Sequence, residues 1–362
     1  MLQFAPFFKR DFVMTRPCLT VDLNAVRQNF ETVCRLTRAR VCPVVKSNAY
    51  GLGAVEITRA LQDAGAVYVS TAQEGAELRG AFSDLQINVL NGIDGDSAAL
   101  FAEKRLTPVI SSVEQAKLWD GGFVLNVETG FNRLGVRDYA AFKGDNRVSS
   151  VMTHLSCAAE DLASPAVQAQ NAKQFAAFEN ALSVLNPETA SLGLDAFLIK
   201  PETLKVGEVR TGAALFGINV FPDETDLKPV LTLTAPVVQV ETVDAGDSVG
   251  YGATWTAKRK TKIAVVAIGY ANGIPRTTGG TVFFKAENER FAAPVVGRIS
   301  MGLLTCDATG VPDSALAKAY LLDDLYTIND LSRDSGRLDT EIMCSFSGMK
   351  RIYTPASYCK ES

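Results

Sequence analysis

The chain has 362 residues, of which 47% are hydrophobic and 21% are charged. This is an ordinary globular composition, and it excludes a disordered chain and a fibrous repeat. The 36 basic and 40 acidic residues give a net charge of -4, so no positive excess indicates a nucleic-acid or anionic-membrane partner. The length suits two domains, or one large barrel with an appendage.

The cysteine and histidine content restricts the kinds of site. Seven scattered cysteines without a CxxC pair predict neither a disulfide framework nor a zinc ribbon, and they favour a reducing cytoplasm. His154 is the only histidine, which excludes a site built from several histidines, and we expect no metal. There is no signal-peptide pattern and no uncharged run of about 18 apolar residues, so we expect a cytoplasmic protein that does not span a membrane.

The N-terminal part alternates short β-rich segments with amphipathic helical ones. Residues 1–14 precede the first regular segment and are predicted to be an extension. Strands are expected at 19–21, 41–45, 67–69, 87–89, 108–110, 123–127, 148–152 and 206–210, and apolar spacing predicts helices at 54–64 and 168–185. Eight strands alternating with helices predict a (β/α)8 TIM-type barrel over residues 15–224. A doubly wound open sheet is the alternative, but no GxGxxG sequence follows an early strand.

The pattern changes after residue 222. The segments 229–243, 262–268, 280–285 and 291–296 are short, rich in Val, Thr and Ile, and broken by Gly, Pro and Asn. This is typical of an antiparallel β-domain. The stretch PDETDLKP predicts a connector, which places the boundary near residue 224 and a C-terminal, mainly antiparallel β-domain over residues 225–362.

The most informative segment is CPVVKSNAYGLG, in which an apolar strand ends at Lys46 and a glycine-punctuated turn follows. Chemistry in (β/α)8 barrels takes place at the carboxyl ends of the strands. A lysine that leaves an apolar strand there can have its pKa lowered by desolvation and can form a Schiff base with an aldehyde. The alternative is an ordinary surface lysine at a strand end.

This segment also resembles a family motif. VVKSNAYGLG is similar to VVKANAYGHG, the pyridoxal-phosphate (PLP) lysine motif of alanine racemases, which are fold-type III PLP enzymes. Further matches follow in family order, namely NVETGFNRLGV, VMTHLSCAAE, VRTGAALFGIN, VGYGATWTA with VVAIGYANGIPR, and VVGRISMGLLTCDATG. A single short motif would be a weak signal, whereas ordered matches over roughly residues 17–310 are specific.

The resemblance implies two catalytic bases, Lys46, which would also hold PLP, and Tyr251. Racemisation removes a proton from one face of a planar carbanion and delivers a proton to the other, so two groups must flank the cofactor. Both side chains have reference pKa values of about 10, and each must be lowered to serve near neutrality. Without the resemblance, Tyr251 would be interpreted as a core aromatic of the β-domain.

The resemblance also assigns residues to the cofactor and the substrate. Arg210 would face the pyridine nitrogen, and because a guanidinium cannot accept the ring proton, the pyridine would stay largely unprotonated. His154 would link the catalytic tyrosine to that arginine, and Arg133 would bind the substrate carboxylate. The phosphate would be held by Tyr50, Ser191, Gly212 and Ala213. Taken alone, Arg210 would be a salt-bridging residue and His154 a structural one.

Family members are head-to-tail dimers, so the resemblance implies a homodimer with shared active sites, in which Tyr251 and Met301 enter the partner's site.

Three residues depart from the family pattern. Asn126 stands where many members carry a carbamylated lysine, Gly302 replaces an aspartate, and Leu52 replaces a histidine. None removes a base, but Gly302 would enlarge the substrate entrance.

These observations lead to the hypothesis of a PLP-dependent racemase that interconverts L- and D-alanine and supplies D-alanine for peptidoglycan. One alternative is a racemase of serine or of larger or cationic amino acids. A second is a non-catalytic PLP-binding homeostasis protein, which would share the barrel and the lysine but lack the β-domain. A barrel decarboxylase of basic amino acids is a more distant alternative.

Overall fold

The computed structural model of the protein describes residues 16–200, 206–219, 226–276, 280–287 and 289–355. The chain divides into two compact units. One contains Asp22–Val230, and the other contains Leu231–Thr354 with the described part of Met1–Val21. The predicted extension over residues 1–14 and the predicted boundary near residue 224 lie outside the described residues.

The first unit is an eight-stranded parallel barrel. Its strands are β2 (Arg40–Pro43), β3 (Ala66–Val69), β4 (Gln86–Val89), β5 (Thr107–Ile110), β6 (Phe123–Asn126), β7 (Val148–Met152), β8 (Ala190–Gly193) and β9 (Val206–Thr211). From β3 to β9, each strand pairs in parallel with the next strand in the sequence, and β9 pairs in parallel with β2. An isolated bridge from Val44 to Tyr68 joins the segment after β2 to β3. The sheet is therefore nearly closed, and the predicted fold class is confirmed.

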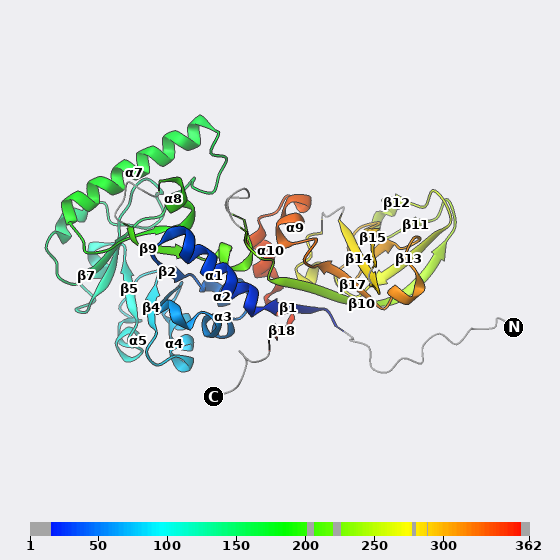
Figure 1. The fold of residues 1–362 in the computed structure, drawn as a ribbon, viewed down its shortest axis with the longest axis horizontal. Coiled ribbons are helices and arrows are strands. Elements are labelled where there is room, and N and C mark those ends of the chain that lie inside the picture. The colour runs from blue at the N-terminus through cyan, green and yellow to red at the C-terminus, as the bar shows by residue number, and fades with distance from the viewer. Residues whose placement is uncertain (1–15, 201–205, 220–225, 277–279, 288, 356–362) are drawn as a thin grey trace. The chain divides into compact units, whose positions relative to one another are not determined.

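One helix, α1 (Leu23–Thr37), precedes the first barrel strand, and the other helices of this unit connect the barrel strands. The connecting helices are α2 (Lys46–Tyr50), α3 (Ala54–Ala60), α4 (Ala72–Ala81), α5 (Ala98–Glu103), α6 (Val113–Ala116), α7 (Pro165–Leu185) and α8 (Leu194–Ile199). Asp22 caps the start of helix α1, because its carboxylate accepts hydrogen bonds from the amides of Asn24 and Ala25. The long helix α7, green in Figure 1, starts with a proline at its first position, which suits the fixed φ of that residue.

The first predicted strand does not belong to the barrel. Strand β1 (Cys18–Asp22) pairs antiparallel with β10 (Leu231–Val243) of the second unit, with Leu19 opposite Leu233. The barrel strand absent from the sequence prediction is β8, whose sequence ASLG contains no β-branched or aromatic residue. All four of its residues are buried, so tertiary packing and not local propensity determines this strand.

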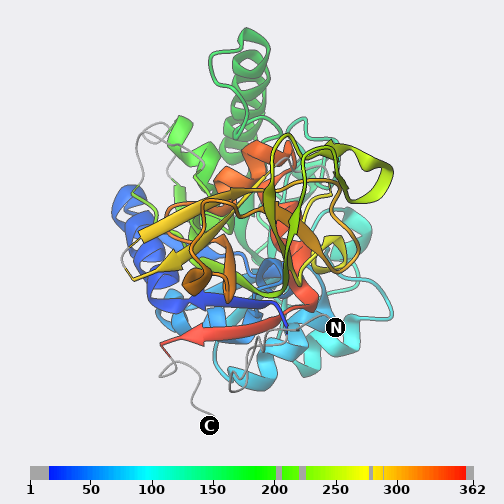
Figure 2. The ribbon, with the colours of Figure 1, turned by 90° about the vertical axis from the view of Figure 1, so that its right-hand side faces the viewer.

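The second unit is a mainly antiparallel β-domain, as predicted. Besides β10 it contains β11 (Ser248–Val249), β12 (Trp255–Thr256), β13 (Thr261–Val266), β14 (Thr281–Ala286), β15 (Glu289–Pro294), β16 (Leu304–Asp307), β17 (Lys318–Leu322) and β18 (Lys350–Thr354), with helices α9 (Ile328–Ser335) and α10 (Asp339–Ser345). Strand β10 pairs antiparallel with β1, β13 and β17. Figure 2 shows β1 in blue beside β18 in red, so both ends of the described chain contribute to one sheet.

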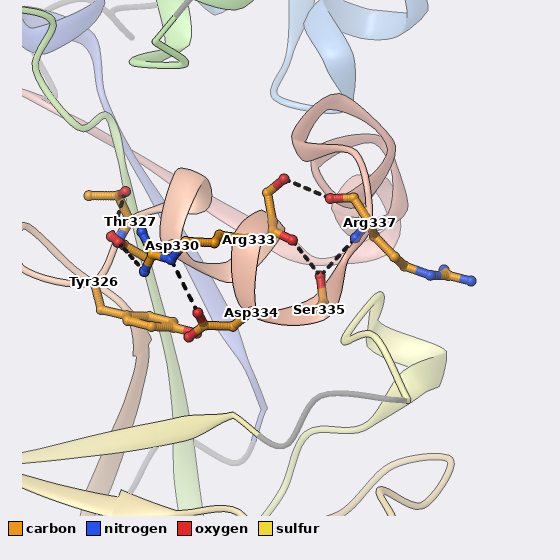
Figure 3. A network of polar contacts seen from close by, with 8 residues as sticks. Tyr326, Thr327, Asp330, Arg333, Asp334, Ser335 and Arg337 are labelled. Carbon is orange, nitrogen blue, oxygen red and sulfur yellow. Dashed lines mark hydrogen bonds and ion pairs between the residues drawn. The ribbon is translucent and has the colours of Figure 1, made fainter. Parts of the chain in front are cut away.

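Polar contacts fix helix α9 at both ends (Figure 3). At its start, the amide and the hydroxyl of Thr327 donate to Asp330 Oδ2 at 2.8 and 2.9 Å, which forms a capping box. The Tyr326 hydroxyl donates to Asp334 Oδ2 at 2.9 Å. Burial and this hydrogen bond raise the pKa of Tyr326, so the phenol stays protonated and the contact persists at neutral pH.

Asp323 is the centre of a buried salt bridge in this unit. Its side chain is 2% exposed, and its carboxylate lies 2.9 Å from Arg290 Nη2 and 3.0 Å from Lys285 Nζ. Burial alone would raise the pKa of Asp323, but the Lys285 ammonium, the amide of Leu325 and the charge of Arg290 together lower it. Because the folded pKa is lowered, this stabilisation is present at neutral pH and is lost as the pH falls through the folded pKa.

We therefore expect Asp323→Asn to lower the free energy of unfolding at pH 7 by about 3 kcal/mol, since two cations lose their buried counter-ion. The matched control is Asp324→Asn. Asp324 is 77% exposed and lies 3.8 Å from Lys285 Nζ, so its loss should cost less than about 0.5 kcal/mol. Urea unfolding at pH 7 and again at acidic pH measures both variants. Equal losses in the two variants at pH 7 would contradict the prediction.

Candidate active site

A cavity of about 410 Å³ lies in the barrel unit, at the carboxyl ends of the strands. Its lining includes the predicted residues Lys46, Tyr50, Arg133, His154, Arg210, Gly212 and Ala213. Arg210 lies in β9, and the other residues follow β2, β6, β7 or β9. These strands are far apart in sequence and are brought together by closure of the sheet. A pocket of this size suits a small ligand.

Lys46 begins α2, which is a left-handed turn and not a regular α-helix. Residues 47–50 all have φ between 51° and 56°. A left-handed backbone costs non-glycine residues roughly 1 to 2 kcal/mol each, so neighbouring structure must hold this segment. Glu74 of α4 contributes, because its carboxylate accepts from the amides of Ser47 at 2.8 Å and Ser70 at 2.7 Å. One carboxylate therefore ties together the segments after β2 and β3, and strain of this kind concentrates at functional sites.

Tyr50 approaches the backbone at the end of β9. A Cβ atom at Gly212 would lie 2.2 Å from the Tyr50 hydroxyl oxygen, so a side chain at residue 212 would force the phenol away. The Tyr50 ring also contacts Phe216, with ring centroids 5.3 Å apart. The phenol hydroxyl is thus held beside the loop that starts at Gly212, at one wall of the cavity.

Arg210 is 6% exposed and its guanidinium is held at two points. Nη1 donates to Ser191 Oγ and Nη2 donates to the Thr153 carbonyl oxygen, both at 2.6 Å. Ser191 is opposite Glu208 in the β8–β9 register, and its hydroxyl donates to Glu208 Oε1 at 2.8 Å. Ser191 is fully buried and is not among the cavity-lining residues. The structure therefore does not place it as a phosphate ligand, because its hydroxyl is engaged by Glu208 and Arg210.

His154 and Arg133 both contact Phe131. The His154 and Phe131 rings are stacked with centroids 5.6 Å apart, and Arg133 Cζ lies 4.1 Å from the centre of the Phe131 ring. Burial, followed by the charges of Arg210, Arg133 and Lys46, lowers the pKa of His154 to about 3. At neutral pH His154 is therefore an uncharged imidazole with one donor and one acceptor nitrogen.

Asp195 is a cavity residue that the sequence analysis missed. It lies in the first turn of α8, and burial raises its pKa. A Cβ atom at Gly193 would lie 2.6 Å from Asp195 Oδ1 and 3.6 Å from His154 Nδ1, so glycine leaves the space between the carboxyl group and the imidazole open. An aspartate two residues after the end of a barrel strand would have indicated a site residue. It was not recognised because β8 itself was not predicted.

The residues that depart from the family pattern have defined places. Asn126 lines the cavity, and its Nδ2 donates to Ser111 Oγ at 3.2 Å and to the Leu134 carbonyl oxygen at 3.1 Å. Leu52 is fully buried. A Cβ atom at Gly302 would meet no atom within 4 Å, so this position is sterically open within the described chain.

Tyr251 and Met301 belong to the second unit and are not among the cavity-lining residues. Their side chains are 66% and 63% exposed. Tyr251 is therefore not a core aromatic, which was the alternative interpretation of this residue. It follows Gly250, whose φ of 80° is in the left-handed region, and it begins a short 3-10 turn.

Two classes of feature are absent from the described part of the chain. Within it, no three His, Cys, Asp or Glu side chains are grouped so that they could hold a metal ion. No helix there is long and apolar enough to cross a bilayer.

Comparison with known proteins identifies relatives along most of the chain. The family models for the alanine racemase N-terminal and C-terminal domains match residues 21–220 and 230–353. The biosynthetic alanine racemase of Mesorhizobium japonicum is 34% identical over 338 residues, which cover 88% of this chain and 83% of the relative. The alanine racemase of Acidiphilium cryptum is 33% identical over 352 residues, which cover 92% of this chain and 97% of the relative.

Solved structures give the same result. The biosynthetic alanine racemase from Pseudomonas aeruginosa matches with a TM-score of 0.83 at 30% identity, covering 94% of this chain and all of the other. The Bartonella henselae alanine racemase, solved with covalently bound pyridoxal phosphate, matches with a TM-score of 0.82 at 27% identity. The match covers 93% of this chain and 99% of the other. Two family models that together span nearly the whole chain, and relatives above 30% identity, establish that this chain belongs to the alanine racemase family.

Proposed function

We propose that Lys46 and Tyr251 are the two bases with which this chain interconverts L- and D-alanine. Family membership gives the activity itself, which is PLP-dependent alanine racemisation. The observation that carries the residue assignment is the cavity, where Lys46 lies with Arg133, His154 and Arg210 at the carboxyl ends of the barrel strands. The biosynthetic relatives support a role in supplying D-alanine for peptidoglycan.

The cavity residues fit PLP. When bound, this cofactor supplies an electron sink that stabilises negative charge at the substrate Cα. The Lys46 amine would hold its aldehyde carbon, Arg210 would face its ring nitrogen, and Tyr50 with the backbone of Gly212 and Ala213 would hold its phosphate. The absence of a Cβ at Gly212, which lets the Tyr50 hydroxyl reach the loop backbone, supports this placement.

The chain's own groups provide the proton chemistry. Arg210 carries a permanent positive charge and cannot accept a proton, so it keeps the atom that it faces unprotonated. Arg133 offers a planar pair of donors that suits the substrate carboxylate, and its contact with Phe131 orients it. Neutral His154 can relay a hydrogen bond without adding a charge to a site that already contains Lys46, Arg133 and Arg210.

We further propose a homodimer in which Tyr251 and Met301 complete the partner's site. The 66% and 63% exposure of these side chains on their own unit supports this arrangement, because both are available to a second subunit. A cytoplasmic location is supported by seven scattered cysteines without a CxxC pair.

The assignment is tested by incubating the purified protein with PLP and single L-amino acids in heavy water. We expect α-proton exchange and D-isomer formation with alanine and not with serine, lysine or arginine. Gly302→Asp, which restores the residue usual in the family, should leave the alanine rate nearly unchanged. Exchange with several amino acids that Gly302→Asp suppresses would favour a broader racemase, and a protein without exchange on any of them would contradict the proposal.

A further inference from the structure

A buried carboxylate, Glu208, lies next to the cavity arginine. Glu208 is 4% exposed and precedes Arg210 by two residues on β9, so both side chains project to the same face of the strand. Its carboxylate accepts hydrogen bonds from the Tyr68 hydroxyl at 2.6 Å and from the Ser191 hydroxyl at 2.8 Å. Neither the motif matches nor the cavity lining includes Glu208 or Tyr68.

The direction of each hydrogen bond in this group is fixed by chemistry. A guanidinium has donors only, so Ser191 Oγ must accept from Arg210 Nη1 at 2.6 Å. The single hydroxyl hydrogen of Ser191 is then left for Glu208 Oε1, and the Tyr68 hydroxyl donates to the same oxygen. Oε1 thus accepts from two hydroxyl groups, an arrangement that suits a carboxylate, which has acceptors only and makes charge-assisted hydrogen bonds. Glu208 and Arg210 therefore form a charge pair bridged by one serine.

The surroundings make this pair costly to break. Tyr68 and the neighbouring Cys42 belong to the apolar cluster that fills the barrel interior. Burial and then the negative charge of Glu208 raise the pKa of Tyr68, while Arg210 opposes the effect. Charges in such an environment persist only when they are paired and hydrogen-bonded, so removing one charge leaves the other uncompensated.

We propose that Glu208 is a positioning residue, which acts through Ser191 and with Tyr68 to fix the orientation and offset the charge of Arg210 at the cavity. This inference rests on the proposed function, because Arg210 is the group assigned to the PLP ring nitrogen. It gives Ser191 a role that differs from phosphate binding, and it explains why a serine and a glutamate face each other across two parallel strands.

The test compares holoprotein variants by spectroscopic titration and by kinetics. Glu208→Gln keeps the shape of the side chain and removes its charge, so the pKa read from the visible absorption of bound PLP should fall by about one unit. Racemisation kcat should fall about tenfold while KM for alanine changes less than about twofold, because a misplaced arginine affects the reacting cofactor more than the substrate carboxylate. Tyr68→Phe removes one donor and no charge, so its spectral shift should be much smaller.

The controls separate positioning from simple loss of stability. Tyr139→Phe removes a phenol that accepts from Asn180 Nδ2 at 2.6 Å outside this group, and it should leave the spectral pKa and kcat unchanged. Ser191→Ala keeps both charges and removes only the bridging hydroxyl, and it should lower kcat severalfold even where Glu208→Gln fails to fold. A lower melting temperature in Glu208→Gln or Ser191→Ala, with wild-type spectral pKa and kcat, would overturn the proposal. A wild-type protein that binds PLP without racemising alanine would instead contradict the proposed function.

Discussion

Replacing Lys46 with alanine is expected to reduce alanine racemisation by at least about 10³-fold in both directions. The reason is that, in the proposed function, one amine serves two purposes: it holds PLP in the cavity and exchanges a proton at one face of the substrate Cα. No other lysine lines the cavity within the described residues, so no neighbouring amine can take over. The absorption spectrum after gel filtration measures retained cofactor, and D-alanine formation from L-alanine measures turnover.

The matched control is Lys173→Ala, an exposed lysine on the barrel helix α7, which should retain wild-type cofactor binding and turnover. Melting temperatures of the cofactor-free proteins show whether Lys46→Ala has altered the fold as well as the site. A Lys46→Ala protein that keeps both the spectrum and the activity of the wild type would mean that the amine is neither the attachment point nor a base.

The barrel was predictable because most of its strands are short apolar runs separated by amphipathic helices. The segments that end at Lys46 and Arg210 have β-branched residues and obey this pattern. Strand β8 does not, since Ala, Ser, Leu and Gly carry no strand signal, and its place between β7 and β9 comes from tertiary packing. Strand β1 was assigned to the barrel because pairing partners far away in sequence cannot be read from local propensity.

The site, like the barrel, could be predicted only in part. Lys46, Arg133, His154 and Arg210 stand in motifs whose resemblance named them, and the cavity brings all four together. The supporting residues were not predictable, because their roles depend on register. Ser191 faces Glu208 only once β8 is placed beside β9, and Asp195 reaches the cavity only as part of the helix that follows β8.

Replacing Tyr251 with phenylalanine is expected to reduce racemisation by at least about 10²-fold while preserving bound PLP. If Lys46 and Tyr251 are the two bases, as proposed, Lys46 is then the one base left. Exchange of the α-proton in heavy water should persist for one enantiomer of alanine and be lost for the other, because each base would serve one face of the substrate. This asymmetry distinguishes a face-specific base from a residue that merely shapes the site, whose removal would slow exchange of both enantiomers equally. Tyr139→Phe, which removes a phenol outside the motif matches and outside the cavity lining, is the control.

Mixing the two inactive variants tests whether the site is shared between subunits. If Tyr251 serves its partner's cavity, a dimer of one Lys46→Ala and one Tyr251→Phe subunit contains one site with both bases and one site with neither. Random reassociation makes half of the dimers mixed, so about one quarter of the wild-type activity should return. If Tyr251 instead served the cavity of its own chain, every site in every dimer would lack one base, and mixing would restore nothing. The same experiment therefore measures the dimer and the second base together, using proteins that are each inactive alone.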